Sequence, residues 1–373
     1  MDIQAFGVEE WLNEWETQAK YDIAGSSIAS MTLEEVLALG DGQAVMGDLL
    51  QAKMNYGWIE GSPAFKEEVA KLYETVSVDS ILQTNGATGA NHLAIYALIQ
   101  PGDHVISLYP SYQQLYDIPR SFGAEVDLWR IDEKRDWLPD LEDLKSLLRP
   151  NTKMICINNA NNPTGAVMTR EFLEKVVELA RSVGAYILSD EVYQPLEEGM
   201  DVPAIVDLYE KGISTNSLSK TYSIPGIRVG WVAANKELSD LFRKYRDYTM
   251  ICAGVIDDAL ATHVLKNKAA ILERNRRLVE GNLRILQDWV EHEPHVQLVF
   301  PKQVSTSFIR LDIPEDTESF CLRLLQEEGV LLVPGNRFDM PGYARLGYCT
   351  HRSILQEGLK RLSAFLRQFD DLD

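Results

Sequence analysis

The chain has 373 residues, of which 45% are hydrophobic and 25% are charged, a composition typical of a globular protein with a large core. Its formal net charge of −20 argues against a nucleic-acid partner, because phosphate binding requires a basic surface. No long apolar run or signal peptide opens the sequence, so we expect a cytoplasmic protein without membrane contact. The cysteines and histidines lack metal-ligand or CxxC spacing, so no metal site or disulfide framework is expected.

The first 60 residues contain two helix patterns. Trp11 and Trp15 lie four residues apart, on one face of an amphipathic helix predicted over 8–20. Thr32 is a favourable N-cap for a short helix over 33–39. The paired tryptophans indicate packing in a core or an interface.

From about residue 60 to 255, short apolar runs alternate with helical patterns. This alternation predicts an α/β domain with a mostly parallel seven-stranded sheet covered by helices on both faces. Ligands of such sheets bind at the carboxyl ends of the strands. The predicted strands are 81–84, 104–109, 125–129, 153–158, 186–189, 213–218 and 228–233, and the predicted helices are 63–75, 89–99, 140–148 and 169–183.

The pattern changes after about residue 255 and predicts a smaller α+β domain. We expect residues 42–258 to form the large domain, and residues 1–41 with 259–373 to form the small one. A long helical tract over 255–291 is predicted to be broken. It is followed by predicted strands at 296–300, 305–311, 330–333 and 343–348, a helix at 317–328 and a final helix.

A hydroxyl-rich turn follows the predicted strand 213–218 and presents a single lysine, Lys220. The hydroxyls of Ser217 and Ser219, the turn N–H groups and the guanidinium of Arg228 could together bind a phosphate. The lysine amine can attack an aldehyde. A solvated lysine in a polar loop would have the same local pattern.

Polar residues also follow other predicted strands. Asn162 precedes a proline and could direct its amide at a ligand, although turns rich in Asn, Pro and Gly are common. Asp190 needs a partner if it is buried, or belongs to a surface turn. The turn 84–89 opens a helix whose first N–H groups could bind an anion. Tyr112 could pack in the core or stack on a flat heterocycle.

In chain order, the segments NNPTG (161–165), SDEVY (189–193) and SLSK (217–220), with an arginine eight residues later, resemble the fold-type-I pyridoxal-phosphate aminotransferases of class I and II. The resemblance covers nearly the whole chain, from Tyr56 to Gly347. It implies pyridoxal 5′-phosphate as the cofactor and the corresponding fold. It specifies the substrate much less closely.

By this resemblance, Lys220 would bind the cofactor as a Schiff base and move the proton from the substrate Cα. Asp190 would pair with the pyridine nitrogen and keep it protonated. Tyr193 and Asn162 would hydrogen-bond the phenolic oxygen, and Tyr112 would stack on the ring. The residues implied for the phosphate are Gly86, Ala87, Thr88, Ser217, Ser219 and Arg228.

The resemblance also implies how substrate and partner bind. Arg345 would hold the α-carboxylate, since an arginine binds a carboxylate with two parallel hydrogen bonds. Asn162 and Gly25 would also contact the substrate. Tyr56 matches a tyrosine contributed by the neighbouring subunit, so an obligate homodimer is expected. The stretch Gly25-Ser26-Ser27 lacks the proline of many family members, which leaves recognition of the substrate open.

The implied reaction is a ping-pong transfer of an amino group from an amino acid to a 2-oxo acid. The same residues would also support carbon–sulfur β-elimination, decarboxylation or cyclisation, because the site rather than the fold decides the chemistry. A regulator that kept the fold and lost catalysis is a further alternative. A nicotinamide-binding protein is disfavoured, because no GxGxxG follows an early strand.

Overall fold

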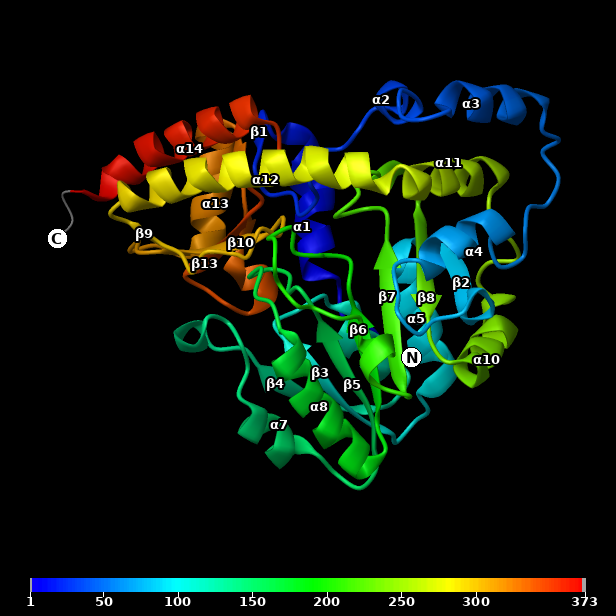
Figure 1. The fold of residues 1–373 in the computed structure, drawn as a ribbon. Helices are drawn as coiled ribbons and strands as arrows, with labels where there is room; N and C mark the ends of the chain where they lie inside the picture. The colour runs from blue at the N-terminus through cyan, green and yellow to red at the C-terminus, as the bar shows by residue number, and fades with distance from the viewer. Residues whose placement is uncertain (1, 371–373) are drawn as a thin grey trace.

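The computed structural model describes residues 2–370 and contains a large seven-stranded sheet (Figure 1). The strand order is β2-β8-β7-β6-β5-β3-β4, and β8 runs antiparallel to both of its neighbours, whereas the other six strands run the same way. All seven predicted strands are present, so the predicted α/β fold class is confirmed. The strands are β2 (Ile81–Asn85), β3 (His104–Tyr109), β4 (Glu125–Arg130), β5 (Thr152–Asn158), β6 (Tyr186–Asp190), β7 (Gly212–Ser217) and β8 (Val229–Ala233).

Helices cover both faces of this sheet, which explains why most residues of its strands are buried, including the polar ones of β7. Successive residues of a strand point to opposite faces. Val105 of β3 packs in one helix-covered core, and the adjacent Ile106 packs in the other. One face is covered by α5 (Gly86–Leu98), α6 (Gln114–Ser121) and α10 (Lys236–Arg246), and the other by α4 (Pro63–Ala70), α7 (Leu141–Leu147), α8 (Arg170–Val183), α9 (Ile205–Leu208) and α11 (Val255–Lys266).

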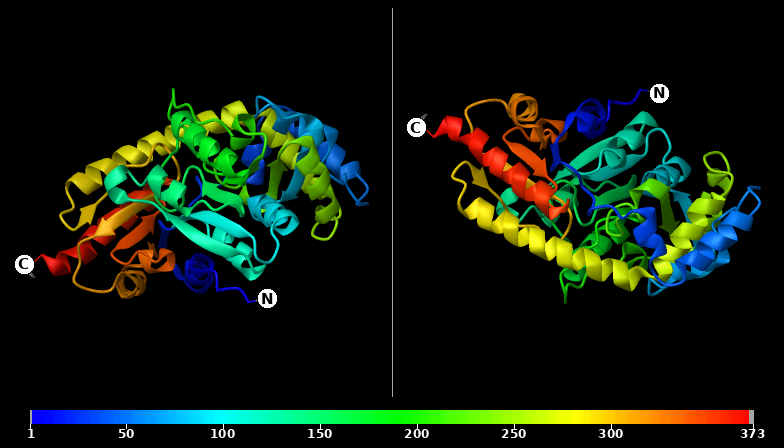
Figure 2. Two further views of the ribbon diagram at one scale, coloured as in Figure 1. Left: turned by 90° about the horizontal axis from the view of Figure 1, so that it is seen from below. Right: turned by 90° about the horizontal axis from the view of Figure 1, so that it is seen from above.

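The C-terminal part of the chain forms an antiparallel sheet with the order β12-β13-β10-β9. Helix α12 (Lys268–Glu291) extends from the large sheet across to this part, where it lies beside α14 (Arg352–Leu366) (Figures 1 and 2). The remaining elements are α13 (Thr317–Glu328), β9 (Val296–Gln297), β10 (Ser307–Leu311), β11 (Val330–Leu331), β12 (Val333–Pro334) and β13 (Tyr343–Leu346).

The N-terminal segment packs against the C-terminal part. In α1 (Gly7–Trp15), Trp11 is buried and donates its indole N–H to the Leu332 carbonyl at 2.9 Å. Strand β1 (Tyr21–Asp22) pairs with β11 in parallel. These contacts support our proposal that residues 1–41 and 259–373 form one domain and 42–258 the other. Val36 of α2 (Leu33–Leu37) and Val264 of α11 pack with the large sheet instead.

Some predicted boundaries were wrong. The helix starting at Pro63 ends at Ala70 rather than continuing to residue 75. The predicted strand 330–333 is two short strands, because Leu331 pairs with β1 and Val333 with β13. Helices α3 (Gly42–Gln51), α6 and α10 were not predicted, and α6 contains an internal proline, Pro119, which is unusual inside a helix. Among residues 2–370, no helix is long and apolar enough to cross a membrane.

Candidate active site

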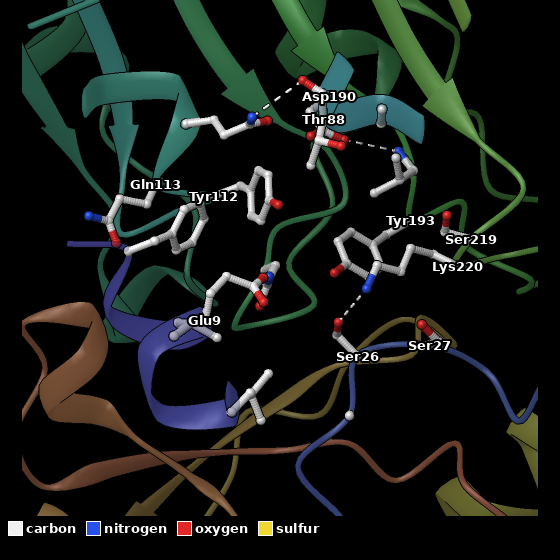
Figure 3. Close-up of a pocket in the computed structure, with 18 of the residues that line it drawn as sticks. Glu9, Ser26, Ser27, Thr88, Tyr112, Gln113, Asp190, Tyr193, Ser219 and Lys220 are labelled. Carbon is white, nitrogen blue, oxygen red and sulfur yellow. Dashed lines mark hydrogen bonds between the residues drawn. The ribbon is translucent and has the colours of Figure 1, made fainter. Parts of the chain in front are cut away.

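A cavity of about 610 Å³ lies at the carboxyl edge of the large sheet, against α1 and the loop that follows β1 (Figure 3). The residues after β6 and β7 reach it because those strands end there. Arg228 reaches it for a different reason. It immediately precedes β8, and since β8 is antiparallel, its first residues begin at the edge where the other strands end.

The Lys220 amine points into the cavity. Its Nζ donates a hydrogen bond to Ser26 Oγ at 2.7 Å and lies 5.7 Å from the centre of the Tyr193 ring (Figure 3). Ser26 is buried, and its carbonyl accepts a hydrogen bond from Ser305 Oγ at 2.6 Å. The loop after β1 therefore holds an oxygen in a fixed position beside the amine.

Asp190 is the last residue of β6 and is only 2% exposed. Its carboxylate accepts hydrogen bonds from Asn91 Nδ2 at 2.7 Å and from the Val192 N–H at 3.3 Å. Burial raises the pKa of Asp190, and these bonds and the charge of Lys220 offset only part of that rise. A buried carboxylate in this position is suited to a protonated heterocyclic nitrogen, which would supply the missing positive charge.

The groups at the start of α5 are suited to a phosphate. Gly86 has a φ of +67°, and a Cβ there would lie 2.8 Å from Arg228 Nη2, so only glycine lets the guanidinium approach the helix start. The first N–H groups of a helix lack intrahelical partners and carry partial positive charge. The other predicted phosphate ligands line the same end of the cavity: Ala87, Thr88, Ser217 and Ser219.

Arg345 lies on β13 and is 2% exposed. Its Nε and Nη2 donate to the Ala24 carbonyl at 3.1 and 3.0 Å, and Nη1 donates to Asn162 Oδ1 at 3.1 Å. Burial lowers its pKa, but a guanidinium remains charged in a protein. It forms no ion pair within residues 2–370. A carboxylate ligand would therefore neutralise a buried charge.

Twelve of the predicted site residues line this one cavity. The exceptions are Gly86, which adjoins Arg228, and Tyr56, which is 85% exposed and lines a separate pocket beside α3 and α11. The role predicted for Tyr56 in a neighbouring subunit stays a prediction. The twelve are Gly25, Ala87, Thr88, Tyr112, Asn162, Asp190, Tyr193, Ser217, Ser219, Lys220, Arg228 and Arg345.

The structure adds residues that sequence reasoning missed. Asn91 holds Asp190 and is itself held by Thr215 Oγ1, which donates to Asn91 Oδ1 at 2.6 Å. An asparagine on the buried side of an apolar helix was a signal that could have identified it. Three carboxylates also line the cavity, Glu9, Glu16 and Asp22, and no motif marked them.

Residues 47–362 match the family model described as aminotransferase class I and II. An aspartate aminotransferase of Thermotoga maritima is 31% identical over 331 residues, which cover 85% of each chain. A crystal structure of a pyridoxal-phosphate-dependent aminotransferase from Streptococcus suis is 61% identical, with a TM-score of 0.97 over all of both chains. A structure of a pyridoxal-phosphate-dependent cyclase is 26% identical, with a TM-score of 0.88 over 99% of this chain and 98% of that one.

Proposed function

Because the chain belongs to the class I and II aminotransferase family, we propose that Lys220, Asp190 and Arg345 carry its reaction, a ping-pong transfer between an amino acid and a 2-oxo acid. The predicted resemblance is confirmed: the protein is a pyridoxal-phosphate-dependent aminotransferase of fold type I. The observation that supports the residue assignment is that the lysine amine, the buried carboxylate and the buried guanidinium face one cavity.

Each end of the cavity would hold one part of the cofactor. When bound, pyridoxal phosphate supplies an electron-withdrawing ring that stabilises negative charge at the substrate Cα. Asp190 would hold a proton on the ring nitrogen, and Tyr112 would lie against the ring face. Arg228 and the N–H groups at the start of α5 would bind the phosphate. Asn162 and Tyr193 would donate hydrogen bonds to the phenolic oxygen.

Lys220 and Arg345 would act on the substrate. Arg345 would hold the α-carboxylate with two hydrogen bonds and so orient the Cα–H bond toward the lysine. A free Lys220 amine that donates one N–H to Ser26 keeps its lone pair available to accept the Cα proton. Lys220 would then return this proton, and the buried side chains around it would limit the access of competing water.

The residue assignment is tested by trapping the lysine. Borohydride treatment of the holoenzyme followed by peptide mass analysis should place the cofactor mass on Lys220. The Lys220→Ala variant should carry no label and no activity, whereas Lys211→Ala, which alters a surface lysine, should match the wild type. In Asp190→Ala, turnover should fall by at least about a thousandfold, because the ring nitrogen would lose the carboxylate that keeps it protonated and the ring electron-withdrawing. Label on another lysine would refute the assignment.

Cyclisation is the second candidate, because the cyclase structure shares the fold over nearly the whole chain. The two reactions differ in their need for an acceptor. Transfer requires a 2-oxo acid for each turnover beyond the first, whereas cyclisation does not. Multiple turnovers of a donor without any oxo acid would therefore favour cyclisation over transfer.

We propose a homodimer in which Tyr56 completes the neighbouring site. Tyr56 lies among exposed apolar side chains, including Trp58 and Ile59, and a patch of this kind is typical of an interface. Mixed dimers of Tyr56→Ala and Lys220→Ala should regain activity, because one of their two sites is intact. Mixed Asp190→Ala and Lys220→Ala should not, since both residues belong to the same chain's cavity. Equal activity of the two kinds of mixed dimer would refute a shared site.

The cytoplasmic location remains a prediction.

A further inference from the structure

Three carboxylates line the cavity on the side formed by α1, the turn after it and β1. Glu9 lies on α1, Glu16 follows that helix, and Asp22 ends β1. Figure 3 shows Glu9 pointing into the cavity, toward Tyr112 and the space in front of Lys220. None of the three forms an ion pair within residues 2–370; Asp22 accepts only the Ala24 N–H, at 2.9 Å.

These carboxylates are close enough to influence one another and the arginine beside them. The pKa of Glu16 is raised first by partial burial and then by repulsion from Asp22 and Glu9. Burial lowers the pKa of Arg345, and the negative charges of Glu9 and Asp22 offset part of that effect. The carboxylates and the buried guanidinium therefore share one electrostatic environment.

The cations that line the cavity are already engaged. In the proposed reaction, Lys220 and Arg228 act on the cofactor and Arg345 on the α-carboxylate. Arg337 pairs with Glu10 and Glu318, both at 2.7 Å. Within the described residues, no unpaired cation of the cavity is left for a substrate side chain. A substrate side chain directed toward α1 and β1 would instead meet three carboxylates that form no ion pair within the described residues.

An aromatic surface adjoins the carboxylates. Phe6 immediately precedes α1 and packs against Tyr112, with ring centres 5.1 Å apart. An aromatic face beside a carboxylate favours a guanidinium or ammonium group, through attraction to both the ring and the negative charge. Phe6 and Glu9 lie three residues apart and line the same wall of the cavity.

We propose that the amino acid substrate carries a cation at the far end of its side chain, as a guanidinium or an ammonium group. This inference rests on the proposed function, because Arg345 must hold the α-carboxylate. A ligand with a carboxylate at one end and a cation at the other neutralises both the buried guanidinium and the carboxylate cluster of Glu9, Glu16 and Asp22. A dicarboxylic donor would bring its second carboxylate toward that cluster.

The test compares ligands that differ in charge and little in shape. Binding of 5-guanidinopentanoate and of neutral 5-ureidopentanoate to the holoenzyme is measured by calorimetry; neither has an α-amine, so neither can react. In parallel, the loss of cofactor absorbance is followed with L-arginine, L-citrulline and L-glutamate, without an acceptor. We expect 5-guanidinopentanoate to bind at least about tenfold more tightly than 5-ureidopentanoate, as three partly exposed ion pairs would give. L-arginine should likewise react at least about tenfold faster than L-citrulline or L-glutamate.

Variants assign the effect to the cluster. Replacement of all three residues, Glu9→Gln, Glu16→Gln and Asp22→Asn, should reduce the cation preference to less than about threefold. Glu9→Gln alone should reduce the cation preference in part. This single variant provides the test if the triple variant does not fold. Glu14→Gln removes the same charge from α1 away from the cavity, and should keep the full preference.

Three outcomes would overturn the inference: equal binding of the guanidino and ureido ligands, faster reaction with glutamate, or a preference that survives the triple variant. The proposed function fails separately. If no amino acid changes the cofactor absorbance while 5-guanidinopentanoate still binds more tightly, the transfer is refuted and the cation preference stands.

Discussion

Replacing Glu191 by glutamine tests how the motif that carries Asp190 is packed. Glu191 follows Asp190 directly, is 8% exposed, and accepts hydrogen bonds on Oε1 from the Ile205 N–H at 2.8 Å and from Ser214 Oγ at 2.9 Å. Burial raises its pKa from 4.5 to about 8, and these bonds oppose only part of the rise. Glu191 is therefore mainly protonated at pH 7.

The expected effect on stability depends on pH. Because the pKa of Glu191 is higher in the folded than in the unfolded protein, its contribution is fully present below about pH 4.5 and is lost as the pH rises through about 8. A rise from 4.5 to about 8 corresponds to roughly 5 kcal/mol between these limits. Glu191→Gln resembles the protonated acid and does not ionise, so it avoids this loss.

The assay is urea unfolding of the apoprotein at pH 5, 7 and 8.5, with fluorescence as the probe. The free energy of unfolding of Glu191→Gln should be close to that of the wild type at pH 5 and exceed it by several kcal/mol at pH 8.5. Glu174→Gln, which changes an exposed residue of α8, should show no such trend. A difference between Glu191→Gln and the wild type that stays constant with pH would contradict the reasoning.

Three further substitutions test positions around the cavity. Ser26→Ala removes the acceptor for Lys220 and should lower kcat about fivefold and shift its pH profile, as loss of a bond worth about 1 kcal/mol would. Asn91→Ala should raise the pKa of Asp190 further and weaken cofactor binding about tenfold or more, as measured by equilibrium dialysis. Arg345→Lys should raise KM for the amino acid at least about tenfold with a smaller change in kcat, because the two-point contact is lost.

Each of these substitutions has a matched control. Ser27→Ala alters the next hydroxyl of the same loop, which lines the cavity, and should leave the pH profile unchanged. His92→Ala changes the neighbour of Asn91 on α5 and should retain cofactor affinity. Arg310→Lys changes an exposed arginine of β10 and should retain KM. If a control variant showed the same change as the variant it is paired with, that change would reflect a general structural effect and not the role proposed for the residue.

The sequence by itself determined the large sheet and the ends of its strands. Apolar runs separated by helical patterns predicted all seven strands, because a sheet covered by helices on both faces buries most of its strand residues. Strand direction then predicted that Asp190, Asn162 and Lys220 would meet at one edge. The local pattern of each strand and the parallel arrangement of the strands are sufficient to bring these residues together.

The tertiary structure decided which distant residues reach that edge. Ser26 contacts Lys220 across 194 positions of sequence, and Asn91 contacts Asp190 across 99. Neither contact can be predicted from the periodicity of the sequence, because each depends on how elements far apart in the chain pack together. The placement of α1 over the cavity likewise turned Glu9 from an ordinary residue of an acidic helix into part of the cavity wall. Local pattern specifies an element and its buried face, whereas its neighbours follow from the packing of the whole chain.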